Sequence, residues 1–175
     1  MTFLGKFVIL LTMKRLKIYL DTSVISHLDQ QDAPDKMADT HTFWGIAKAG
    51  GFDIFISPVD MEELDKCSPE KLSRLKHYLS EVKLTLLEKN SEAEELAKLY
   101  IDAHVLSERH IDDCRHIAYA CAANCDIIVS WNFKHIVNHK TISGVKSVNA
   151  IAGYKEMAIY TPTILISTEE NDDTL

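Results

Sequence analysis

The chain has 175 residues, of which 46% are hydrophobic and 26% are charged, and its formal net charge is −7. A chain of this length buries about 70% of its unfolded surface on folding, which is enough for a single domain with its own core. The acidic net charge argues against a protein that holds nucleic acid by bulk electrostatics, so basic contacts must be local.

The cysteines indicate neither a disulfide framework nor a zinc site. They occupy positions 67, 114, 121 and 125, which lack the paired short spacings of a zinc site, and three of them share an apolar helical stripe. We expect reduced thiols in the core and therefore a cytoplasmic protein.

The first twelve residues differ from the rest. The opening MTFLGKFVILLTMKRLK is similar to a signal peptide, but Lys6 interrupts its apolar run, which is too short to span a bilayer and lacks a cleavage site. We therefore expect no membrane anchor. Residues 1–12 are expected to be a peripheral or disordered extension, with an extra strand or helix as the alternative. One domain is expected over 13–165, followed by an acidic tail over 166–175.

Predicted strands alternate with predicted helices along the chain. In order, we expect a strand at 17–20, helical spacing over 24–28, a helix at 35–49, a strand at 52–57, helices beginning at 58, 69 and 91, a helix at 110–125, and strands at 126–130 and 157–161. Ser57 and Ser68 are expected N-caps, and Ser91 with Glu94 has the pattern of a capping box. This alternation predicts an α/β fold with a parallel sheet covered on both faces.

Four polar residues are expected near the ends of strands. Asp21 directly follows the first strand, Glu63 lies in the helix after the second, Asp113 begins the helix leading into 126–130, and Asn132 follows that strand. Ligands of open parallel sheets collect at the carboxyl ends of the strands, so these side chains can point into one crevice. Converging carboxylates repel each other, and Mg²⁺ or Mn²⁺ is the natural ion to neutralise them.

Each acid also has an ordinary structural explanation. Asp21 can cap the following helix, and Glu63 can be a solvated helix residue. Asp113 and its neighbour Asp112 are equally suited to a first helical turn, where the helix dipole favours acids. The shared placement at strand ends is the stronger observation.

Three stretches, YLDTSVIS, ISPVDMEEL and DDCRHIAYACAANCDIIVSWNF, together resemble the PIN-domain nucleases, which include the toxins of bacterial toxin-antitoxin pairs. The resemblance covers roughly residues 16 to 165 and implies a three-layer α/β/α domain with Mg²⁺- or Mn²⁺-dependent ribonuclease activity. It assigns Asp21, Glu63 and Asp113 as catalytic, metal-binding acids and Ser23 as a nearby supporting hydroxyl. Glu63 matches the family better than Glu62, because the family's acid directly precedes the leucine.

Asn132 occupies the position of the family's fourth acid. An amide there lowers the charge available for a second ion, and it leaves open whether one or two metals bind. The resemblance further implies an RNA substrate and an antitoxin protein as a partner, while a homodimer stays open. The segment KHIVNHK at 134–140 is expected to supply a local positive rim.

The sequence thus favours a metal-dependent endoribonuclease over two alternatives, and the resemblance includes the toxins of toxin-antitoxin pairs among such enzymes. One is a catalytically weak or inactive PIN-like module that binds RNA or protein, which Asn132 and the acidic charge favour. The other is a phosphotransfer or receiver-like domain, although Thr22 and Ser23 follow Asp21 where such proteins typically carry a second aspartate.

Three further residues near these acids are interpreted as structural. His116 lies three residues after Asp113 on the same predicted helix, and a lone helix histidine is more often structural than catalytic. Trp131 and Phe133 flank Asn132 and are interpreted as core aromatics rather than as platforms for nucleic-acid bases.

Overall fold

The computed structural model describes residues 15–172, with side chains described up to residue 167. The expected extension at 1–12 lies outside these residues. The chain forms a parallel five-stranded sheet in the order β3-β2-β1-β4-β5. The strands are β1 (Leu16–Leu20), β2 (Phe52–Ile56), β3 (Leu84–Leu86), β4 (Ile127–Val129) and β5 (Ala158–Tyr160).

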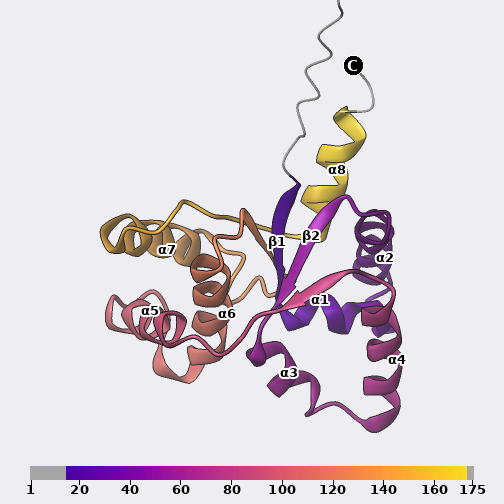
Figure 1. Cartoon of the computed structure of the whole chain (residues 1–175), viewed down its shortest axis with the longest axis horizontal. Coiled ribbons are helices and arrows are strands. Elements are labelled where there is room, and N and C mark those ends of the chain that lie inside the picture. Colours follow the sequence, from indigo (N-terminus) through magenta and orange to yellow (C-terminus); the bar gives the residue numbers. More distant parts are fainter. Residues whose placement is uncertain (1–14, 173–175) are drawn as a thin grey trace, which may run out of the picture.

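Helices cover both faces of the sheet (Figure 1). On one face lie α5 (Ser91–Asp102), α6 (Ile111–Ala122) and α7 (His139–Ala152); on the other lie α1 (Thr22–Ser26), α2 (Pro34–Lys48), α4 (Pro69–Ser80) and α8 (Pro162–Asp172). The short α3 (Pro58–Leu64) packs residues into both layers. The three-layer α/β/α arrangement and the parallel sheet are as predicted. None of the described helices has the length and apolarity needed to cross a membrane.

The alternation of side chains along the strands divides the core in two. In β1, Ile18 and Leu20 pack toward α1, α2 and α4, whereas Tyr19 packs toward α5 and α6. All three are fully buried. A strand buried on both faces accounts for the continuous apolar run that precedes Asp21.

The connections of the sheet place the ends of β1 and β4 side by side. From β1 the chain proceeds through β2 and β3 in one direction, while β4 and β5 lie on the other side of β1. Leu20 pairs with Val129, and the Asp21 amide donates a hydrogen bond to the Val129 carbonyl at 3.0 Å. Asp21 and Ser130 therefore leave neighbouring strands at the point where the strand order reverses, which is the usual ligand position in such sheets.

Several details differ from the sequence predictions. The capping box expected at Ser91 and Glu94 is wrong: Asn90 is the N-cap, and its side chain accepts a hydrogen bond from the Glu92 amide at 2.9 Å. Glu94 instead binds Arg115. Neither β3 nor α7 was predicted, and α8 contains residues up to Asp172 of the expected acidic tail.

Candidate functional site

Asp21 joins the ends of β1 and β4 through two serine hydroxyls. Its side chain makes no N-cap hydrogen bond; instead, one carboxylate oxygen accepts hydrogen bonds from Ser23 and Ser130, each at 2.5 Å. The same hydroxyls accept hydrogen bonds from backbone amides of the loop after β4. Ser23 accepts from the Trp131 amide and Ser130 from the Asn132 amide, both at 2.9 Å. Asp21 is only 4% exposed, so the hydroxyls supply hydrogen bonds that a buried carboxylate requires.

A polar network lies beneath Asp21. The Tyr19 hydroxyl lies 2.7 Å from the Ser57 hydroxyl, 2.8 Å from His116 Nδ1 and 3.0 Å from a carboxylate oxygen of Asp60. The second oxygen of Asp60 accepts from the Thr22 hydroxyl at 2.9 Å. Asp60 also accepts from the Ser57 amide at 2.8 Å, which completes the capping box of α3.

His116 is the cation of this network. Its Nε2 lies 3.1 Å from Glu63 and 3.6 Å from Asp21, and its Nδ1 lies 3.8 Å from Asp60. Burial lowers the pKa of His116, but the surrounding carboxylates outweigh burial and raise that pKa to about 10. His116 is therefore protonated at neutral pH. Burial opposes ionisation of Glu63, yet the hydrogen bond and charge of His116 give its pKa a net lowering.

Asp113, like Asp60, has a pKa above its ordinary value. Burial, followed by the charge of Asp21, raises the pKa of Asp113 to about 6; Glu63 adds to this rise and His116 opposes it. One carboxylate oxygen accepts a hydrogen bond from the Asn132 side-chain amide at 2.8 Å. Burial and the charges of Asp21 and Glu63 therefore oppose the ionisation of Asp113.

Asn132 orients Asp113. Its side-chain oxygen accepts from the His135 backbone amide at 3.0 Å, while its NH₂ group donates to Asp113. A backbone N–H can only donate, so this contact fixes which end of the Asn132 amide faces Asp113. The end of Asn132 that reaches the site is thus a donor, which is unsuited to binding a cation.

The adjacent acids on α3 and α6 face different partners. Glu62 and Asp112 each bind Arg115, at 2.9 and 3.1 Å. Glu63 contacts His116, and Asp113 contacts Asn132. In both pairs, the first acid binds Arg115 and the second has other partners: Glu63 lies in the group with Asp21 and His116, and Asp113 in a group with His110 and His135.

Sequence reasoning missed Asp60 and Ser130 and gave His116 too little weight. A signal existed for Asp60, since Ser57-x-x-Asp60 has the spacing of a capping box. Trp131 is buried and donates to Thr40 at 2.9 Å, as expected of a core residue. Phe133 is 48% exposed, so its interpretation as a core aromatic was wrong. It lies in the loop after β4, where the buried pattern of the strand no longer applies.

The donor set of the crevice fits a hard cation. Carboxylate oxygens of Asp21 and Glu63 lie within 4.8 Å of each other, and the protonated His116 beside them is not a metal ligand. Mg²⁺ and Mn²⁺ need one or two protein carboxylates and keep several waters. Asp21 and Glu63 supply two carboxylates, and burial followed by the charges of Asp21 and Glu63 raises the pKa of Asp113, so a cation there would offset part of this cost.

A comparison with protein-family models gives no match, and a comparison with curated proteins gives none either. The likeness to the PIN-domain nucleases therefore remains a resemblance of short sequence motifs.

Asp113→Asn should stabilise the metal-free protein at neutral pH. A raised pKa means that ionisation costs folding free energy, a cost absent below the ordinary aspartate pKa and complete above the folded value of about 6. We expect a gain on the order of 1–3 kcal/mol at pH 7, shrinking toward zero near pH 4. Urea unfolding of both proteins with a chelator present measures it; a loss of stability at pH 7 would contradict the description of Asp113.

Proposed function

We propose that the chain is a divalent-metal-dependent endoribonuclease, a hydrolase of the PIN-domain type. The observation that supports the proposal is the close pair of Asp21 and Glu63, with Asp113 near enough for their charges to raise its pKa, at the end of the sheet where the strand order reverses. Carboxylates at this place in an open α/β sheet form a ligand site, and oxygen donors select a hard cation.

Several residues of the chain position the three carboxylates of such a site. Ser23 and Ser130 fix the Asp21 carboxylate, and Asn132 fixes Asp113. His116 holds its proton on Nε2 toward Glu63 and thereby keeps that carboxylate ionised. Asp21, Glu63 and Asp113 would hold Mg²⁺ or Mn²⁺. When bound, the cation supplies an activated water and offsets charge on the phosphodiester.

The surface beside the crevice has features that suit a single strand of RNA. Phe133, one residue after Asn132, is 48% exposed. The Lys36 ammonium lies 5.1 Å from the centre of the Phe133 ring and 5.5 Å from that of Trp131. An exposed aromatic ring can stack on a base while a neighbouring lysine contacts phosphate. Lys36 thus supplies a local positive charge on a chain whose net charge is −7.

A PIN-like module that binds RNA or protein without cutting is the second candidate. Asn132 favours it, since an amide replaces a carboxylate and presents a donor to the site. A toxin role, an antitoxin partner, a homodimer and a cytoplasmic location stay predictions. The free cysteine thiols accord with a reducing compartment.

Mn²⁺ should stabilise the folded protein and support cleavage of an unstructured RNA. Ligand binding to the folded state adds about 2.7 kcal/mol when the ion is 100-fold above its Kd. Asp21→Asn should abolish cleavage and remove most of the rise in melting temperature that Mn²⁺ causes. Asn132→Asp should strengthen Mn²⁺ binding, because it adds a carboxylate. Calorimetric titration and a gel assay measure these effects.

The Asp21→Asn protein, purified identically, also controls for contaminating nuclease. Equal cleavage by wild type and Asp21→Asn would remove support for the nuclease proposal. Mn²⁺-independent RNA binding without cleavage would favour the binding module.

Phe133→Leu should weaken binding of single-stranded RNA, since one base–aromatic stack contributes about 1–3 kcal/mol. Phe133→Trp should restore binding, and Leu86→Ala, at an exposed apolar residue of β3, serves as a control. Fluorescence anisotropy in the Asp21→Asn background avoids cleavage. With an abasic oligonucleotide, the effect of Phe133→Leu should disappear; an equal loss on both oligonucleotides would rule out stacking.

A further inference from the structure

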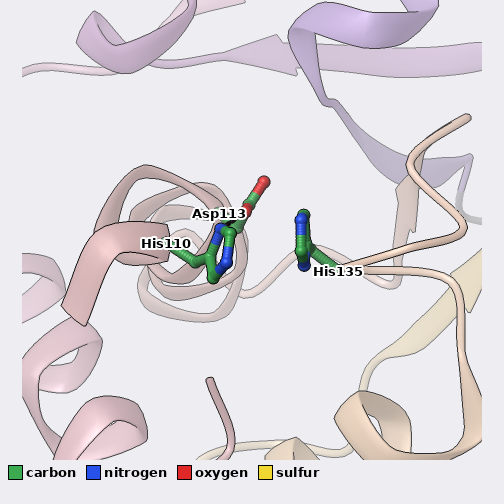
Figure 2. A group of neighbouring side chains, drawn as sticks. All are labelled: His110, Asp113 and His135. Carbon is green, nitrogen blue, oxygen red and sulfur yellow. Dashed lines mark ion pairs between the residues drawn. The ribbon is translucent and has the colours of Figure 1, made fainter. Parts of the chain in front are cut away.

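Two histidines, His110 and His135, lie beside Asp113. His110 ends the short 3₁₀ turn η2 (Glu108–His110) that precedes α6, and His135 lies in the loop after β4. Figure 2 shows the two rings side by side, with the Asp113 side chain next to them. Ligand atoms of His110, Asp113 and His135 all lie within 4.8 Å of one another.

We propose that His110, Asp113 and His135 form a binding site for a transition-metal ion such as Zn²⁺ or Co²⁺. The proposal goes beyond the nuclease function and does not depend on it. Two imidazoles and one carboxylate are a ligand set that suits these ions and leaves a position for water, whereas Mg²⁺ prefers oxygen ligands alone. The ligand types therefore separate this site from the acidic crevice.

The backbone around the histidines is fixed by hydrogen bonds. The His135 amide donates to the Asn132 side chain at 3.0 Å, and the His135 carbonyl accepts from the Thr141 hydroxyl at 2.8 Å. Asn132 also donates to Asp113, so one side chain sets the positions of two of the proposed ligands. Partners of this kind orient metal ligands in known sites and contribute to affinity.

The ring nitrogens are accessible to an ion. His110 Nδ1 lies 3.5 Å from the Asp113 carboxylate, and its Nε2 accepts a hydrogen bond from exposed Arg109 at 3.1 Å. Within the described part of the chain, neither ring nitrogen of His135 has a hydrogen-bond partner. Coordination through His110 Nδ1 moves the ring proton to Nε2, which breaks the contact with Arg109 and replaces the direct Nδ1–Asp113 contact by bonds of both groups to the ion.

The two rings must turn when an ion binds. Their centres are 3.8 Å apart and their planes are inclined by 29°, which is a stacked arrangement. A coordinating imidazole directs its lone pair at the ion within the ring plane, so both rings rotate about their Cβ–Cγ bonds to converge. Both side chains are partly exposed, which leaves room for this rotation.

The site shares Asp113 with the acidic crevice. Because one carboxylate then serves two neighbouring cations, binding of Zn²⁺ at the histidines is coupled to binding of Mn²⁺ at the acids. The coupling is reciprocal, as for any two ligands with a shared binding group.

Isothermal titration of the full-length protein with Zn²⁺ alone tests the site. Wild type should bind Zn²⁺ saturably, and His110→Gln and His135→Gln should each weaken binding by roughly tenfold or more. His77→Gln, at an exposed histidine of α4, is the matched control and should bind as wild type does. Asp21→Asn should retain Zn²⁺ binding, which separates this outcome from failure of the nuclease proposal.

A second measurement on wild type requires no variant. Diethyl pyrocarbonate modifies accessible imidazoles, and peptide mass spectrometry locates the modified residues. Zn²⁺ should protect His110 and His135 while leaving His77 reactive. The proposal would be overturned if wild type did not bind Zn²⁺, if both histidine variants bound it as wild type does, or if only Asp21→Asn lost binding. It would also be overturned if His110 and His135 reacted equally with and without Zn²⁺.

Discussion

The charge of one buried imidazole, His116, allows four acids to gather at the end of the sheet. Its ring contacts Tyr19 and Glu63 and lies near Asp21 and Asp60. Buried carboxylates are costly unless they are paired and hydrogen-bonded. His116 lowers the pKa of Asp60 and of Glu63, but burial still leaves the pKa of Asp60 raised, and burial with the neighbouring acids raises the pKa of Asp113. The arrangement leaves a place for an external cation near Asp113.

The stability of the protein and the chemistry of the crevice are therefore linked through pH. The raised pKa of His116 means that its contribution to folding is complete below the ordinary histidine pKa of about 6.5 and is lost as pH rises through about 10. Asp113 also has a raised pKa, but its ionisation opposes folding at a much lower pH. At neutral pH the folded chain thus retains a charged, cation-attracting crevice while His116 still stabilises it.

Local patterns were sufficient to predict the α/β class and the parallel sheet, although β3 and α7 were not predicted. The position of Asp21 after an apolar run could be read from the sequence, whereas the choice of Glu63 over Glu62 came from the family resemblance; in the structure Glu62 binds Arg115 and Glu63 contacts His116. The partners of these acids depend on contacts between distant segments, such as the bond between Asn132 and Asp113. No periodicity in the sequence indicates that His135 meets His110. For the same reason the exposure of Phe133 could not be read from its neighbours.

The titration of the His116 ring, followed by ¹⁵N NMR with side-chain assignment from His116→Gln, tests this account most directly. The account predicts that the imidazole stays protonated at about pH 8, far above the ordinary histidine pKa of about 6.5, because three carboxylates surround it. A ring that is neutral at pH 7 would contradict it, since Asp21 and Glu63 would then lack the cation that holds them.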